Sequence, residues 1–159
     1  FVVTFAVIIA IFEMGFDVVF QKFLPAIYAP NFQVPSVAQA LSSIFYGGVA
    51  QEILLRWGIM AAVIYILSAK GENLNEWNRT IGIIFTAILY AFAQYSTGVP
   101  FVDVSFIIFV RILLTTGLAG ILYGWLFTTF HFEAAVVSHV LANVLVIFGH
   151  SVIAGLNIL

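Results

Sequence analysis

Long, sparsely charged apolar stretches follow one another along this chain. The first covers residues 1–24, and comparable stretches cover about 35–69, 80–96, 104–130 and 133–148. A helix of roughly 20 apolar residues is long enough to cross the hydrocarbon core of a bilayer. With 64% hydrophobic and only 8% charged residues, a soluble fold of 159 residues would leave too much apolar surface in water. The sequence therefore predicts an all-α, polytopic transmembrane helix bundle of about five to six helices.

The whole chain, residues 1–159, is expected to form one integral-membrane domain, since neither a low-complexity segment nor an internal repeat divides it. Residues 149–159 are expected to begin the sixth helix. The most hydrophilic segment, 69–79, reads AKGENLNEWNR and predicts an aqueous loop. Phe1 lies inside an apolar stretch, so we expect that the N-terminus is truncated and that the natural protein extends further.

Charge and cysteine content exclude several classes of function. The net charge of -2 argues against a nucleic-acid partner, which requires a basic face. Because the chain has no cysteine, disulfides, thiol catalysis and cysteine-ligated metals are excluded. The bilayer is the expected environment, and we expect a multi-pass protein of a prokaryotic plasma membrane.

Two pairs of polar residues interrupt the apolar stretches with helical spacing. Glu52 and Arg56 stand at i and i+4, so their side chains project from one helix face and can form an ion pair. Gln51 lies next to Glu52 around the same helix. His139 and Asn143 repeat the i, i+4 spacing in another stretch. Because polar groups are costly within a membrane-spanning helix, we expect such side chains to meet inside the bundle, with Gln51, Gln94, His139 and Asn143 converging on one water-accessible cavity.

A polar stripe marks the first apolar stretch. Glu13, Asp17 and Gln21 follow one another at i, i+4 and i+8, and we expect this face to pack against other helices rather than lipid. Arg111 is expected to neutralise one acid, which is Asp17, Glu13 or Glu133. Buried charges of this kind are often merely paired, so no catalytic role follows from the stripe.

Small residues predict where helices approach one another closely. Gly47 and Gly48 precede the polar pair of the second stretch, where they can bend the helix or admit another backbone. Gly120 and Gly124 form a small-xxx-small pair in the fourth stretch. Both features support a tightly packed bundle and say little about function.

The order and spacing of the polar groups resemble the CAAX protease and bacteriocin-processing family (CPBP, Abi), which comprises glutamate-type intramembrane endopeptidases. That family reads Glu-Glu-x-x-x-Arg, then Phe-x-x-x-His, then His-x-x-x-Asn or Asp, on successive helices. The resemblance covers a core of about residues 36–147. The corresponding motifs in this chain are Gln51-Glu52-x-x-x-Arg56, Tyr90-x-x-x-Gln94 and His139-x-x-x-Asn143.

The resemblance implies endoproteolysis by activated water, with a hydrophobic or lipidated peptide, such as a prenylated one, as the partner. No cofactor is expected. The family naming admits a divalent metal such as zinc, but one histidine and one glutamate fall short of a three-ligand zinc site. The catalytic set that the resemblance implies consists of Glu52, His139, Asn143, Arg56, Gln51 and Gln94.

Two positions depart from the family pattern. Gln51 and Gln94 stand where the resembled enzymes carry the glutamate and histidine that activate water, and an amide cannot take a proton near neutral pH. Losing a general base costs about 100- to 10,000-fold in rate. Three explanations stay open: a pseudoprotease that binds without cutting, a rewired base made of Glu52 and His139, or an introduced substitution at one glutamine.

Three classes of function therefore compete. The first is a CPBP-type endopeptidase, whether active or degenerate. The second is a non-catalytic membrane binding or bacteriocin-immunity protein that uses the same cavity. The third is a small transporter or channel component, which requires Glu13, Asp17, Glu52 and Arg111 to line one continuous water path as a charge relay.

Overall fold

The computed structural model describes residues 1–24, 34–69, 71, 73–98 and 106–156 of the chain. Within these ranges the chain forms five continuous helical rods, some of which change their helical type along their length. Their segments are α1 (Val2–Phe20), α2 (Val37–Ser42), η1 (Ser43–Ala50), η2 (Ile53–Met60), α3 (Ala61–Leu67), α4 (Glu76–Gly98), α5 (Phe106–Ile112), η3 (Leu113–Gly117), α6 (Leu118–Thr129) and α7 (Phe132–Gly155).

The all-α transmembrane bundle predicted from the sequence is confirmed. Four of the rods are long and apolar enough to cross a membrane, and they comprise α1, residues 37–67, residues 106–129 and α7. The expected sixth helix does not begin at residue 149, because α7 continues without a break to Gly155. Residues 157–159 lie outside the described part of the chain.

The hydrophilic segment 69–79 is shorter as a loop than predicted. Helix α4 already begins at Glu76, because the side-chain oxygen of Asn75 accepts a hydrogen bond of 2.9 Å from the backbone N–H of Asn78. Glu76 then pairs with Arg79 at 2.8 Å within the first turn. A cap and an i, i+3 ion pair thus extend a helix into a strongly polar sequence.

Three segments adopt the wider π-helical hydrogen-bonding pattern. Two of them, η1 and η2, flank Gln51 and Glu52 within the continuous rod of residues 37–67. The third, η3, joins α5 to α6. Such π segments within α-helices are often found at functional sites. The predicted glycine pair, Gly47-Gly48, lies inside η1.

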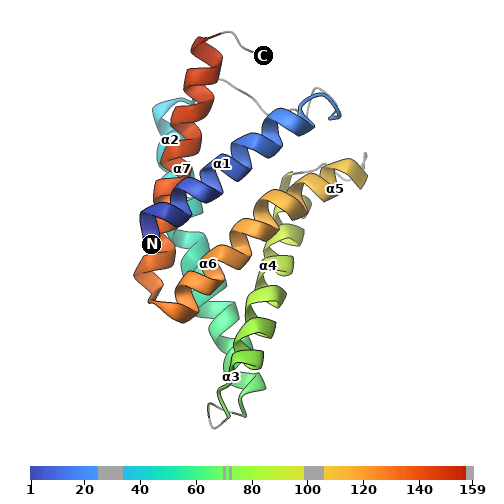
Figure 1. Ribbon diagram of the computed structural model, residues 1–159, viewed down its shortest axis with the longest axis vertical. Coiled ribbons are helices and arrows are strands. Elements are labelled where there is room, and N and C mark those ends of the chain that lie inside the picture. The colour runs from blue at the N-terminus through green and yellow to red at the C-terminus, as the bar shows by residue number, and fades with distance from the viewer. Residues whose placement is uncertain (25–33, 70, 72, 99–105, 157–159) are drawn as a thin grey trace.

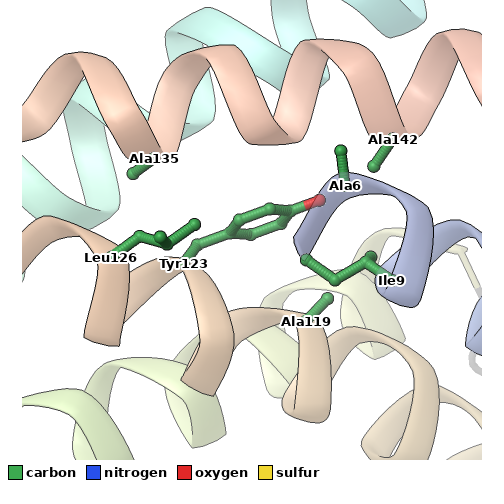
Figure 2. Packing of buried hydrophobic residues seen from close by; sticks show 7 residues of the cluster. All are labelled: Ala6, Ile9, Ala119, Tyr123, Leu126, Ala135 and Ala142. Carbon is green, nitrogen blue, oxygen red and sulfur yellow. The ribbon is translucent and has the colours of Figure 1, made fainter. Parts of the chain in front are cut away.

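Helix α7 is the central helix of its half of the bundle, because it packs against α1, α6 and η1. Figure 1 shows α1 crossing α7, while α4 runs beside α6 in the other half of the bundle. The main core cluster lies between α1, α6 and α7, and Figure 2 shows the Tyr123 ring extending from α6 into it. Its buried members are Ala6, Ile9, Ala119, Tyr123, Leu126, Ala135 and Ala142.

The glycines predicted to allow close approach do so. A Cβ atom added at Gly48 would lie 2.6 Å from Val140 Cγ2 and 3.1 Å from the Val140 backbone on α7. One added at Gly120 would lie 3.1 Å from Ala87 Cα on α4. One added at Gly124 would also be tightly placed, 3.1 Å from a side-chain carbon of α4. These contacts set the separation of the helices that carry the polar motifs.

Replacing Gly48 with alanine is expected to destabilise the protein by about 1–3 kcal/mol, since the methyl group would meet backbone atoms that no rotamer change can move. Thermal unfolding in detergent micelles measures this effect. Gly15→Ala is the matched control, because a Cβ at Gly15 has no atom within 4 Å among its neighbours. Equal stability of the two variants would contradict close packing between η1 and α7.

Candidate active site

The three motif-bearing helices meet around a cavity of about 370 Å³. Gln51 comes from the rod of residues 37–67, Gln94 from α4, and His139 and Asn143 from α7. The predicted convergence of these four side chains on one cavity is therefore present in the fold. The remaining lining residues are Glu13, Ser42, Ser43, Tyr46, Gly47, Tyr90, Thr116 and Ala119.

His139 is held in place by Glu52. The two side chains approach to 2.9 Å, between His139 Nδ1 and Glu52 Oε1, although 87 residues separate them in the sequence. Glu52 is fully buried, at 0% exposure, so it lies behind the histidine and does not line the cavity. An ionised carboxylate can only accept, so Nδ1 carries the hydrogen and Nε2 is left as the nitrogen that gains or loses a proton.

Arg56 supplies the charge that balances Glu52. Its Nε lies 3.2 Å from Glu52 Oε2, and the exposure of both side chains is 0%. The two groups are close but poorly aligned, so the guanidinium nitrogens have no hydrogen-bond partner within the described residues. Because Arg56 is fully buried and does not line the cavity, it can hold Glu52 but cannot reach a substrate.

An aromatic ring stacks on one face of the His139 imidazole. Tyr123 stacks on His139 with ring centroids 4.3 Å apart and an interplanar angle of 16°. Tyr123 is itself buried in the core cluster of Figure 2. A stack on one side and a carboxylate at Nδ1 leave the imidazole little rotational freedom, which preorganises it for proton transfer.

The two glutamines at the departing motif positions are joined through a tyrosine. The Tyr90 hydroxyl donates to Gln51 Oε1 at 2.6 Å, and Gln94 Nε2 donates to the Tyr90 hydroxyl at 3.4 Å. Phenylalanine, the residue of the family pattern at position 90, has no hydroxyl and could not make this link. The amides therefore form an ordered, uncharged wall of the cavity.

Asn143 is positioned by the π segment η1. Its Nδ2 donates to the backbone carbonyl of Ser43 at 2.8 Å. A Cβ atom at Gly47 would lie 3.0 Å from the same nitrogen, so the glycine makes room for the amide. One hydrogen of the Asn143 amino group satisfies Ser43, and the second can be offered to a ligand in the cavity.

Glu13 is the cavity residue whose position the sequence did not reveal. Its place in the stripe with Asp17 indicated a packed face, but only Glu13 of these two acids lines the cavity. Asp17 instead pairs with Arg111, as expected, and also lies 3.3 Å from His150 Nε2. The sequence did not indicate that His150 lies beside Asp17, because the two residues are on helices that are far apart in the sequence.

The four charged residues that a transporter relay requires do not together line this cavity. Of the four charged residues that it needs, Glu13 lines the cavity, while Glu52 is fully buried behind it. Asp17 and Arg111 neutralise each other away from the cavity lining. Of the four charged residues, Glu13 alone therefore lines this cavity.

The donor set also bears on metal binding. Within the described residues, no group of three or more histidine, aspartate or glutamate side chains is arranged to hold a metal ion. Both carboxylate oxygens of Glu52 already lie against protein partners, His139 and Arg56. The side chains at this site therefore do not fit a three-ligand zinc centre.

Comparison with known families identifies the helices that build this site. Residues 33–145 match the family model described as type II CAAX prenyl endopeptidase Rce1-like. The comparisons with curated proteins and with solved structures gave no match. The matched region covers most of the chain and contains all three polar motifs. This integral membrane protein therefore belongs to the Rce1-like family of type II CAAX prenyl endopeptidases.

Proposed function

We propose that this protein hydrolyses peptide bonds of membrane-embedded or prenylated peptides, with water as the nucleophile and His139 and Glu52 as the proton-transfer pair. The observation that carries the proposal is the 2.9 Å contact between Glu52 and His139, whose imidazole lines a cavity of about 370 Å³. This is the rewired alternative of the sequence analysis. It needs no proton acceptor at Gln51 or Gln94.

Each retained group has a distinct task in this reaction. Water attacks the carbonyl carbon of the peptide, and His139 transfers protons through Nε2 while Glu52 holds the imidazole at Nδ1. The free N–H of Asn143 donates to the oxyanion that develops on the carbonyl oxygen. Arg56 places a positive charge beside Glu52 within the bundle. The carbon–nitrogen bond then breaks, and the leaving amine takes up a proton from His139 Nε2.

A neighbouring groove supports a lipidated substrate. The groove has a volume of about 220 Å³ and is lined mainly by apolar side chains of α1 and α6, with Thr115 of η3 and Glu13 as its polar members. It shares Glu13 and Ala119 with the polar cavity, so the two spaces adjoin. An apolar chain in the groove would place an attached peptide next to His139.

Restoring the family residues tests the proposed reaction. We expect Gln51→Glu together with Gln94→His to raise kcat on an internally quenched prenylated peptide at least about 10-fold, since each substitution adds a group that can accept a proton. The Tyr90 hydroxyl can still donate to a carboxylate at position 51, so the wall should stay ordered. Liquid chromatography with mass spectrometry of the products checks the cleavage position.

Absence of cleavage by the unmodified protein would contradict the proposed function, whether or not the restored protein cleaves the peptide. A second candidate, a non-catalytic binder, is favoured by the uncharged wall of Gln51, Tyr90 and Gln94. It predicts saturable binding of the same peptide without cleavage and no gain on restoring the two positions. Equilibrium binding in detergent micelles, measured beside the cleavage assay, separates the two candidates.

A further inference from the structure

A carboxylate reaches the cavity from a helix outside the family core. Glu13 lies on α1, whereas the family match begins at residue 33. We propose that Glu13 replaces the missing base of position 51 and takes the proton from the attacking water. This inference rests on the proposed hydrolytic function and adds a catalytic residue to it.

The packing of α1 directs Glu13 into the bundle. Ala6, Ile9, Ala10 and Asp17 are the buried residues of this helix, and Glu13 continues the same stripe three positions after Ala10 and four before Asp17. The buried stripe faces α7, which makes the most extensive contact with α1. Figure 2 shows Ala6 and Ile9 of this stripe beside Tyr123, with Ala6 directed toward α7. Glu13 therefore shares a face with residues that define the core, not with lipid-exposed ones.

Glu13 is the available carboxylate of the two near the site. Glu52 is fully buried, and its two oxygens lie against His139 and Arg56. Glu13 is only partly buried, and within the described residues no hydrogen bond or ion pair engages it. Asp17 and Arg111 are its charged neighbours, and those two already pair with each other. Water in the cavity can therefore meet Glu13 but not Glu52.

Two proton-transfer groups allow acid and base tasks to be divided. The water oxygen bonds to the carbonyl carbon, and its proton passes to Glu13. His139, which Glu52 holds at Nδ1, donates a proton from Nε2 to the amine nitrogen as the carbon–nitrogen bond breaks. The proton on Glu13 then returns to His139 through water in the cavity. The balance is one water consumed, with one carboxyl and one amino product formed.

The test uses the full chain in detergent micelles and the quenched prenylated peptide. Glu13→Gln is expected to lower kcat about 100-fold with little change in KM, because the amide cannot accept the proton. Adding Gln51→Glu to this variant should recover at least about 10-fold, since it returns a carboxylate to the same cavity. Glu13→Asp should retain more activity than Glu13→Gln. Glu133→Gln, on the exposed start of α7, is the matched control and should leave kcat unchanged.

Carboxyl labelling measures access independently of activity. A hydrophobic carbodiimide should modify Glu13 and leave Glu52 unmodified, as peptide mass spectrometry would report, and bound substrate should protect Glu13. Modification of Glu52 but not Glu13 would contradict the placement of the two acids.

The kinetic outcomes separate this inference from the proposed function. Full activity of Glu13→Gln overturns the role of Glu13 and leaves hydrolysis standing. Loss of activity that neither Gln51→Glu nor Glu13→Asp recovers means a structural role, and it also overturns the inference. An unmodified protein without activity overturns both proposals.

Discussion

Replacing His139 with glutamine is expected to lower kcat by about 100- to 10,000-fold, the range seen when a general acid–base group is removed. The glutamine amide can still donate to Glu52, so the buried carboxylate keeps a hydrogen-bond partner. It cannot, however, carry a proton to or from the substrate. The change thus removes the chemistry while disturbing the packing little. Cleavage of the quenched prenylated peptide measures the loss.

This experiment is best made in the Gln51→Glu, Gln94→His background as well as in the unmodified chain, so that a large decrease can be followed. His131→Gln is the matched control, because His131 is exposed at the start of α7 and makes no capping hydrogen bond through its side chain. If His139→Gln kept most of the activity in both backgrounds, the imidazole could not be the proton-transfer group.

Removing the positive charge of Arg56 is expected to cause the largest loss of stability. Arg56→Met would leave the fully buried carboxylate of Glu52 without its cationic partner, and breaking such a pair costs about 3–5 kcal/mol. Methionine retains much of the side-chain volume, so the effect reports charge more than packing. Reversible unfolding in mixed micelles gives the change in free energy of unfolding.

A double variant separates charge from packing. Glu52→Gln combined with Arg56→Met removes both charges and should recover most of the lost stability, because buried ion pairs replaced as a unit are often neutral. Arg79→Met is the surface control, since Arg79 pairs with the highly exposed Glu76 and such pairs contribute about 0–1 kcal/mol. A double variant as unstable as Arg56→Met would contradict the charge argument.

The sequence alone predicted the membrane environment, the helical bundle and the motif residues. These features depend on local composition and spacing: apolar length sets which segments can span, and the i, i+4 interval sets which side chains share a face. The same reasoning placed Glu52 beside Arg56 and His139 beside Asn143. It also predicted that Gly48 and Gly120 lie at close helix contacts, since small residues are what such contacts require.

The ends of the helices were harder to predict, because they depend on hydrogen bonds and ion pairs of individual side chains. The cap at Asn75 and the pair of Glu76 with Arg79 start α4 inside a segment whose polarity indicated only a loop. Hydropathy measures the preferred solvent of a residue, not the hydrogen bonds that satisfy a helix terminus.

Only the tertiary structure decided which faces meet. Glu52 lies against His139, although 87 residues separate them, and Arg56 lies behind Glu52. Glu13 lines the cavity, whereas Asp17, one helical turn away, pairs with Arg111. Periodicity fixes the direction of a side chain relative to its own helix axis. The rotation and crossing of each helix against the others follow from side-chain packing between distant segments, which no local pattern in this chain encodes.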